Sequence, residues 1–477
     1  MNLPYDITNL PYDITSKESI LLHAQTLLGK TLRCIHPNAV QYRRGRGAMG
    51  NSVEKIHFKY EPNNEAEPDF TEAGIELKCT PLKLLQDGSL VSKERLVLNI
   101  IDYIKEAQNT FDSSSFWHKN SLLLLMFYLH ENGIDVVNLT FKIIRLWNFP
   151  EVDLKIIRDD WNKLHLKMCN GLAHEISEGD TLYLGACCKG SRAGAEMREQ
   201  FIKDAPKAQQ RAYSFKSKYI NSIILESLNH PEMHDNVFIS NIQRKKIKRN
   251  IKEASNIVTS LDEYQENETF EDLVIKRFNP FYGKNIYEIE NITNKEISSS
   301  PKAISNSVIH AILNVKTKKI KEFEKANLQQ KSIRLEHNGY LKESMVFSQI
   351  DYIGIVDEKK WEDSVLYETL TQRFLFVVFR KDLSKDNKKT ILEKVFFWAM
   401  PHKDLAIAKK FWEDTQNKIK SDKFDEFWKI SDDKFFHVRP KAKNNSDTMK
   451  TPSGKMVTKK AYWINAKYIL NIVNSNI

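Results

Sequence analysis

Cysteine is scarce in this sequence, and the few cysteines follow no recognised spacing. The chain of 477 residues contains five, which form no C-x-x-C pair and no cluster with the spacing of zinc ligands. An odd number of scattered cysteines is typical of free thiols in a reducing compartment. We therefore expect neither a disulfide framework nor a structural zinc site.

Long apolar runs are missing as well. No stretch approaches the length of about 20 apolar residues that a membrane-spanning helix needs. The first residues also lack the basic segment and apolar core of a secretory signal. These two absences predict a cytoplasmic protein that has no membrane partner.

The length of the chain predicts more than one domain. A chain of 477 residues is too long for one ordinary hydrophobic core, and two domains are the natural expectation. The formal net charge of +10 favours a polyanionic partner, but only weakly, because many proteins are this basic for other reasons.

The most informative feature is an internal repeat with offsets between 249 and 255 residues. Five short matches occur in the same order in both halves, which is hard to obtain by accident. The matched segments are 28–32 with 282–286, 51–53 with 306–308, 93–104 with 342–353, Trp161 with Trp412, and 212–219 with 461–468. We therefore predict two domains of one fold, at 1–230 and 269–477. A polar linker, 231–268, would join them, and it contains the basic run at 244–249.

Continuous apolar runs predict a central buried strand in each half. They span 122–128 in the first half and 374–379 in the second. Runs of this length suit a sheet that helices cover on both faces, so the fold class is α/β. Thr15 and Glu18 have capping-box spacing, which predicts a helix that begins near Ser16. The glycine-rich basic segment 42–47 is typical of a loop.

Candidate catalytic residues lie between 68 and 78. Glu76 and Lys78 are two apart in an apolar frame, so a strand would place them on one face, with Asp69 nearby at a turn after Pro68. Two carboxylates, Asp69 and Glu76, suit hard divalent cations that assist phosphodiester hydrolysis. The lysine could position the attacking water, deprotonate it or stabilise the transition state. Glu54, expected on a helix, is a fourth candidate.

A rival set has the same spacing. Asp351, Glu358 and Lys360 lie in a polar stretch rather than an apolar strand, which argues against them.

The repeat offers an internal control for the active site. It aligns residues 75–78 with 333–336, which places Arg334 opposite Glu76; Glu54 falls on Ile309 and Asp69 near Asn327. The metal ligands and the lysine would all be replaced, so we expect the second half to fold alike and to be unable to cut.

Four segments resemble a known family: Gly50-x-x-x-Glu54, 68–78, 92–99 and 437–442. The first half resembles the mismatch-repair nicking endonuclease MutH, and the whole chain is similar to Sau-type type II restriction endonucleases with two tandem MutH-like domains. The resemblance implies restriction-endonuclease-like PD-(D/E)xK domains, each a mixed sheet flanked by helices. Asp69, Glu76 and Lys78 would be the catalytic core, with Glu54 as an additional acid.

The resemblance also implies a substrate and partners. These are double-stranded DNA cut at 5′-GATC with Mg²⁺, a second domain that binds DNA as an allosteric effector, and a cognate DNA methyltransferase. One catalytic site cannot cut two strands at once, so we expect two protomers to pair on DNA.

Several basic residues are candidates for DNA contact, since arginine suits guanine edges and lysine suits phosphates. Each could equally be a solvated surface cation. The candidates are Lys119, Lys189, Arg192 and Lys218 in the first half and Arg439, Lys441, Lys443 and Lys467 in the second. Lys218 and Lys467, with the tyrosines at 213, 219, 462 and 468, are expected to open a helix in each half.

Two alternatives remain open at this point. A MutH-like mismatch-repair enzyme would only nick one strand, although it needs only one such domain. A DNA-binding regulator without catalysis would bind DNA but not cut it with any metal.

Overall fold

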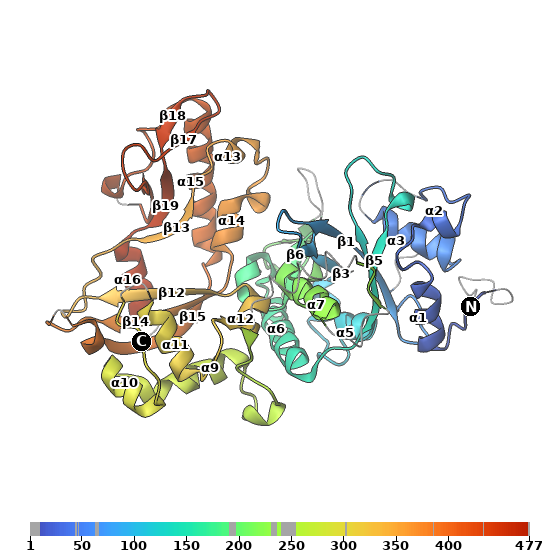
Figure 1. Ribbon diagram of the computed structural model, residues 1–477, viewed down its shortest axis with the longest axis horizontal. Coiled ribbons are helices and arrows are strands. Elements are labelled where there is room, and N and C mark those ends of the chain that lie inside the picture. Colours follow the sequence, from blue (N-terminus) through green and yellow to red (C-terminus); the bar gives the residue numbers. More distant parts are fainter. Residues whose placement is uncertain are drawn as a thin grey trace. The chain divides into compact units, whose positions relative to one another are not determined.

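A computed structural model shows two compact units (Figure 1). It describes residues 10–42, 45, 47–62, 66–189, 197–229, 236–239, 254–300, 303–384, 386–432 and 434–475. The first unit comprises Met1–Ile176, Thr181–Glu263 and Lys319–Ala326. The second comprises Ser177–Asp180, Tyr264–Lys318 and Asn327–Ile477.

The first unit is built on a mixed sheet in the order β2-β1-β4-β5. β1 runs parallel to β4, and the other two pairings are antiparallel. Its strands are β1 (Glu76–Leu84), β2 (Leu90–Ser92), β4 (Leu123–Leu129) and β5 (Phe141–Trp147). The first five residues of β4 are fully buried, which confirms the central strand expected at 122–128.

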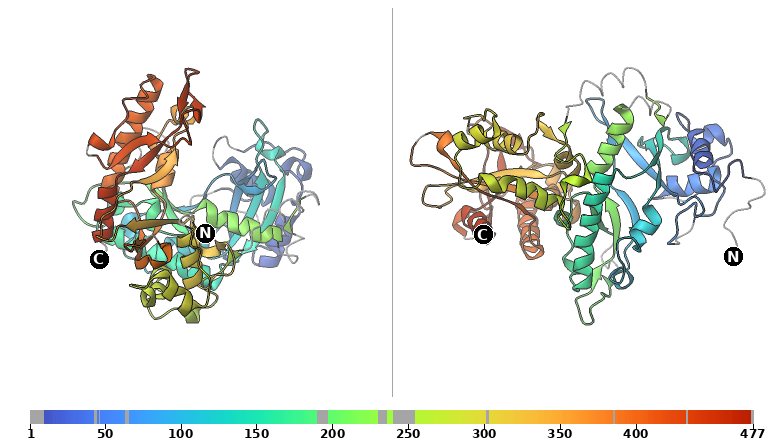
Figure 2. Two further views of the ribbon diagram at one scale, coloured as in Figure 1. Left: turned by 60° about the vertical axis from the view of Figure 1, so that its left-hand side comes forward. Right: turned by 90° about the horizontal axis from the view of Figure 1, so that it is seen from below.

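A second, antiparallel sheet of the first unit has the order β3-β9-β6. Its strands are β3 (Leu96–Ile100), β9 (Arg211–Phe215) and β6 (Leu184–Cys188). The helices are α1 (Lys17–Gln25), α2 (Leu32–Ile35), α3 (Ala48–Ser52), α4 (Tyr103–Glu106), α5 (Ser115–Asn120), α6 (Glu151–Cys169), α7 (Ser217–Asn229) and α12 (Lys321–Ala326). α6 packs on β6 and α7 on β2, and Figure 2 shows these helices from two further directions.

The second unit repeats the antiparallel sheet and three strands of the mixed sheet; no described strand takes the place of β2. Its mixed sheet has the order β12-β14-β15, from β12 (Gln329–Leu335), β14 (Phe374–Arg380) and β15 (Ile391–Trp398). Its antiparallel sheet has the order β13-β19-β16, from β13 (Met345–Gln349), β19 (Lys460–Ile464) and β16 (Phe436–Pro440). The helices are α9 (Phe270–Phe278), α10 (Ile286–Thr293), α11 (Ile304–Ile312), α13 (Gly354–Asp357), α14 (Val365–Leu370), α15 (His402–Lys420) and α16 (Ala466–Ser475).

Matching backbone hydrogen bonds show that the sequence repeat is a structural one. The Gly29 N–H donates to the Phe141 carbonyl over 2.9 Å, and the Gly283 N–H donates to the Leu392 carbonyl over 2.8 Å. Each bond ties the end of an N-terminal helical segment to the first or second residue of β5 or β15. The fold class, two tandem α/β domains with mixed sheets, is therefore confirmed.

Two local expectations need correction. α1 is capped by the Ser16 side chain, which accepts from the Ser19 N–H, so the cap lies one residue later than the Thr15–Glu18 spacing indicated. Tyr213 and Tyr462 lie in β9 and β19 rather than in helices, because the repeated segment spans a strand and the helix after it.

Part of the stretch expected as a linker packs into the first unit. Ile257 and Val258 are buried, and their N–H groups donate to the Glu322 carboxylate on α12. Short strands β10 (Ala254–Ser255) and β11 (Lys319–Ile320) pair in parallel beside them. The basic run at 244–249 lies outside the described residues.

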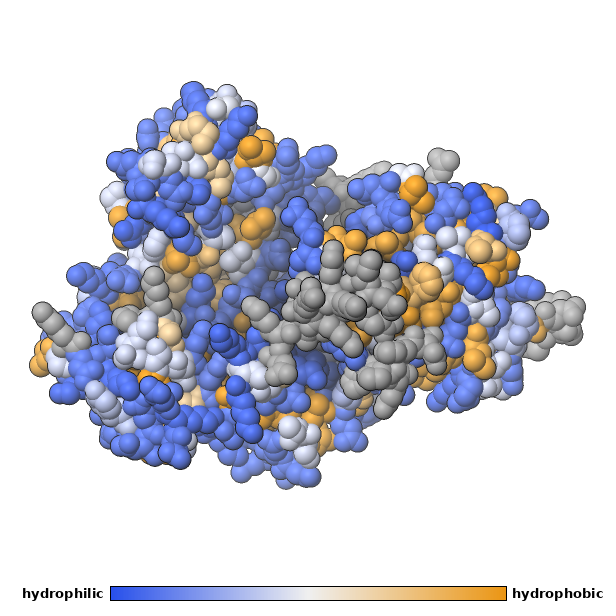
Figure 3. All heavy atoms as spheres, viewed as in Figure 1, coloured by the Kyte–Doolittle hydropathy of each residue, from blue (hydrophilic) through white to orange (hydrophobic). Residues whose placement is uncertain are grey.

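The described helices include none that is both long and apolar enough to cross a membrane. On the face shown in Figure 3, hydrophilic residues predominate and apolar ones are scattered between them.

Candidate active site

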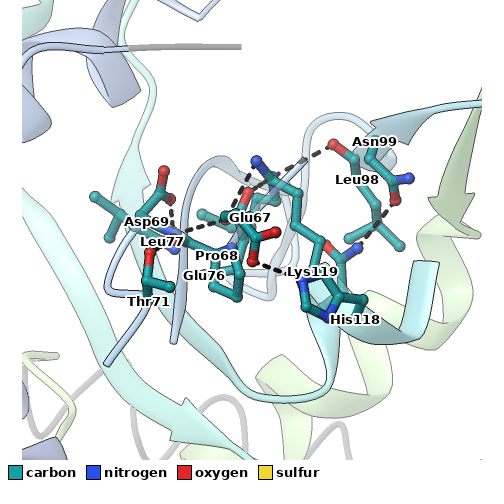
Figure 4. Close-up of polar contacts among 12 residues, drawn as sticks. Glu67, Pro68, Asp69, Thr71, Glu76, Leu77, Leu98, Asn99, His118 and Lys119 are labelled. Carbon is teal, nitrogen blue, oxygen red and sulfur yellow. Dashed lines mark hydrogen bonds and ion pairs between the residues drawn. The ribbon is translucent and has the colours of Figure 1, made fainter. Parts of the chain in front are cut away.

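A tight turn folds Asp69 back onto the start of β1. Phe70 and Ile75 exchange two backbone hydrogen bonds, of 2.9 and 3.1 Å, and Gly74 closes the turn with a φ of 66°. Only glycine adopts this left-handed conformation without strain. The Leu77 N–H then donates to Asp69 Oδ2 over 2.9 Å. The turn therefore sets the position of the aspartate relative to the strand (Figure 4).

Glu76 and Lys78 project from one face of β1, as the strand period requires. The Lys78 ammonium lies 2.5 Å from Glu76 Oε1, and the Asp69 N–H donates to Glu76 Oε2 over 3.1 Å. Only 3% of the Glu76 side chain and 15% of the Lys78 side chain are exposed. The three residues selected from the sequence therefore form one cluster.

Lys119 joins this cluster from α5. Its Nζ lies 3.7 Å from Glu76 Oε2, and 11% of its side chain is exposed. We had expected a DNA contact here; the geometry places the ammonium against the acid of the cluster itself. Parallel pairing of β1 with β4 explains this, because α5 ends just before β4 and so delivers Lys119 to the start of β1.

Other residues around the cluster were missed by sequence reasoning. Lys78 also donates to the Leu98 carbonyl over 3.4 Å. Asn120, on α5, donates to Asn99 of β3, which anchors that helix to the second sheet. His118 Nε2 lies 2.6 Å from Glu67 Oε2 (Figure 4). These residues belong to four separate segments, so no spacing in the sequence connects them.

Glu54 lies on a π-helical turn, Val53–His57, that continues α3. Such turns are frequent at functional sites. Its charge reaches Asp69: burial raises the pKa of Asp69 well above its usual value, Glu76 and Glu54 raise it further, and Lys78 opposes them. Asp69 thus lies within electrostatic reach of two further acids, Glu76 and Glu54.

The donor set fits a hard divalent cation. Mg²⁺ binds through one or two carboxylates and keeps several waters or phosphate oxygens. Among the described residues, no group of three or more histidine, cysteine, aspartate or glutamate side chains is placed to hold a metal. Asp69 and Glu76 nevertheless supply two carboxylates, and repulsion between them, which raises the pKa of Asp69, is what a cation would relieve.

Strand register identifies the counterparts of these residues in the second unit. Glu76 pairs with Leu123 in β1–β4, and Gln329 pairs with Phe374 in β12–β14. Leu123 is the first residue of β4 and pairs with Trp147, the last residue of β5. Phe374 is likewise the first residue of β14 and pairs with Trp398, the last residue of β15, so the two residues are equivalent. Gln329 is therefore the counterpart of Glu76.

The alignment expected from the sequence was wrong at this strand. Arg334 does not replace Glu76; Gln329 does. The lysine of the cluster is retained, because Lys331 holds the place of Lys78. The carboxylate at the Glu76 position is lost from the second unit, as expected, but the ammonium is not.

The rival set has a structural role. Glu358 accepts hydrogen bonds from Trp412 Nε1 over 2.6 Å and from the Val365 N–H over 2.8 Å. In the first unit, Glu106 likewise accepts from Trp161 Nε1 over 3.1 Å. These carboxylates fix helix contacts.

The candidate DNA contacts lie in different settings. Arg192 lies outside the described residues, and Lys189 is half-buried at the end of β6. Arg439, on β16, is exposed, with its guanidinium 5.1 Å from the Trp463 ring centroid. The other candidates are exposed: Lys218, Lys441, Lys443 and Lys467.

Comparison with known proteins agrees with this architecture. The model of the family "DNA mismatch repair enzyme MutH" matches residues 58–160 and 313–410, one range in each half. The type II restriction enzyme Sau3AI of Staphylococcus aureus is 31% identical, over 95% of this chain and 97% of that enzyme. The chain belongs to the Sau3AI family of type II restriction enzymes. It is therefore a DNA-cutting hydrolase, which argues against a regulator without catalysis.

The first matched range contains the whole cluster of this restriction enzyme except Glu54, which precedes it by a few residues. The second contains β12, β14 and β15, and hence Gln329 and Lys331.

Proposed function

We propose that this restriction enzyme makes Mg²⁺-dependent double-strand cuts in DNA at 5′-GATC and that its first unit performs the chemistry with residues that lie within 1–230. One observation carries the proposal. Asp69, Glu76 and Lys78 are in contact in the first unit, whereas the described part of the second unit has Gln329 where Glu76 stands.

The side chains suggest a division of labour. Asp69 and Glu76 would hold the ion, which when bound polarises a phosphate oxygen and lowers the pKa of a water ligand. Lys78 lies 2.5 Å from Glu76 and is placed to orient the attacking water or to stabilise charge on the phosphate. Lys119, on the other oxygen of Glu76, would offset charge on the same phosphate. Glu54 adds negative charge that favours the cation.

Cleavage of a plasmid with one GATC site tests this assignment. Glu76→Gln gives the first unit the residue found at the equivalent place in the second. We expect it to lower the cleavage rate at least about a hundredfold, because it removes a charged ligand without changing the shape. Sequencing of the product ends tests the site.

Glu358→Gln is the matched control, because it makes the same chemical change in the rival set. It should leave the rate within about threefold of wild type, since a glutamine oxygen still accepts from Trp412. Equal loss of activity in both variants would contradict the assignment, as would full activity of Glu76→Gln.

The second unit, which includes most of the predicted domain 269–477, would bind DNA as an effector. The resemblance to Sau-type enzymes and the exposed Arg439 and Lys441 support this role. Arg439→Ala should lower stimulation of cleavage by a second GATC site. Because each chain carries one such cluster among its described residues, two protomers would pair to cut both strands. An initial rate that stays strictly first order in enzyme would argue against pairing.

The match to a mismatch-repair family favours one competing function, a cut in a single strand. The product from a one-site plasmid separates the two: linear DNA supports the restriction activity, and an open circle that never becomes linear supports nicking.

A further inference from the structure

Lys331 occupies the place of the catalytic lysine but lies in different surroundings. Its Nζ donates to the Val346 carbonyl over 3.4 Å and lies 5.3 Å from the Phe347 ring centroid. In the first unit, Lys78 makes a comparable contact with the Leu98 carbonyl and also pairs with Glu76. The position of the ammonium is thus retained without its acid.

Within the described residues, no carboxylate pairs with Lys331. The charged group that acts on it is Lys441: burial lowers the pKa of Lys331, and the Lys441 charge lowers it further. A half-buried cation beside another cation is costly unless an anion from outside compensates it. In the described part of the chain, Lys331 therefore has no counter-ion where Lys78 has one.

Two other charges of the first cluster have also been replaced. Lys119 is the fifth residue of α5, and the fifth residue of α14 is Thr369. Ile309, opposite Glu54 in the repeat, is buried and apolar. Together with Gln329, these changes remove two acids from the surroundings of Lys331, which outweighs the loss of the Lys119 charge.

Lys441 has a counterpart in the first unit, Lys189. Its N–H donates to the Lys459 carbonyl over 2.9 Å, as the Lys189 N–H donates to the Gln210 carbonyl over 2.8 Å. The segment that leaves β16 thus carries an exposed lysine close to the retained one.

We propose that Lys331 and Lys441 bind a backbone phosphate of DNA directly, without a metal ion, at the place where the first unit would act on the scissile phosphate. The degenerate active site of the second unit is then a phosphate-binding site. This inference rests on the proposed DNA-binding role of the second unit. Lys331 supplies the positive charge that the first unit would obtain from a divalent ion.

Binding of a fluorescent GATC duplex to the full chain in EDTA, at several NaCl concentrations, tests the proposal. Lys331→Gln should weaken binding about tenfold, the effect of one charged hydrogen bond. It should also reduce the slope of log K against log salt by about 0.9, the value for one phosphate contact. Lys331→Arg should restore most of both. Lys388→Gln, the same change at a lysine of the second unit that already pairs with Glu290 over 2.7 Å, should alter affinity less than about twofold.

A second variant covers the case in which Lys331→Gln lowers the melting temperature. Gln329→Glu should give Lys331 an internal partner, weaken binding in EDTA, and regain affinity when Mg²⁺ is added. Unchanged affinity and salt slope in Lys331→Gln with wild-type melting, or unchanged affinity in Gln329→Glu, would overturn the proposal. Wild-type cleavage of a GATC plasmid reports separately on the proposed function.

Discussion

Lys325 provides a test of how the first unit is assembled. It lies on α12, far along the chain, but its ammonium is 2.6 Å from both oxygens of Asp153 on α6. Only 11% and 3% of the two side chains are exposed, so water screens the pair little. Removing one member of a buried ion pair costs about 3 kcal/mol or more, because it leaves the other charge uncompensated.

We therefore expect Lys325→Met in the full chain to destabilise the first unit by about 3 kcal/mol. For a unit of this size the melting temperature should fall by about 6 to 12 °C. Differential scanning calorimetry measures the shift. Asp69→Asn, which alters only the first unit, identifies which transition belongs to it.

A double-mutant cycle supplies the control. Asp153→Asn combined with Lys325→Met removes both charges, so the double variant should be more stable than the sum of the single losses by about 2 kcal/mol. Additive losses below about 1 kcal/mol each would refute the reasoning. A shift confined to the transition of the second unit would also do so, because α12 would then not stabilise the first.

Three further outcomes follow from the active-site geometry. Burial and Glu76 raise the pKa of Asp69 in the folded protein above its value in the unfolded chain. The free energy of unfolding of the metal-free protein should therefore decline as the pH rises through the folded pKa. In thermal melts, Asp69→Asn should reduce this decline above about pH 4. An alanine at position 74 has room for its methyl group, but a residue with a side chain is strained in the left-handed backbone conformation there. Gly74→Ala should therefore lower the free energy of unfolding in urea by about 1 kcal/mol and slow cleavage. Lys119→Gln should lower the cleavage rate about a hundredfold. It should leave the affinity for DNA in EDTA within about threefold of wild type, since the lysine charge already faces Glu76. A loss of affinity as large as the loss of cleavage rate would mark Lys119 as a DNA contact only.

The two units show that one strand arrangement can carry different side chains at the start of the strand. β1 and β12 pair in parallel with the central strand over seven residues each, 76–82 and 329–335, and both paired stretches end in a buried leucine, Leu82 or Leu335. The pairing depends on backbone hydrogen bonds and apolar faces, which are indifferent to the side chains at the start of each strand. Glu76 can therefore become Gln329 at little structural cost.

The amino-acid sequence determined the parts that depend on local periodicity. Apolar runs marked β4 and β14, and the two-residue period of a strand placed Glu76 and Lys78 on one face. The repeat revealed two copies of one fold, because its matches recur at nearly constant offset.

Tertiary structure alone decided what depends on pairing between distant segments. An isoleucine and a leucine two apart occur at both 75–77 and 333–335, so sequence similarity aligned these two segments, which are not equivalent in the fold. Only the hydrogen bonding of β12 to β14 identified Gln329 and Lys331 as the counterparts of Glu76 and Lys78. In the same way, Lys119 reaches Glu76 through the β1–β4 pairing, and α12 joins the first unit through Asp153. Such contacts are set by packing across the fold, which residue spacing along a chain does not encode.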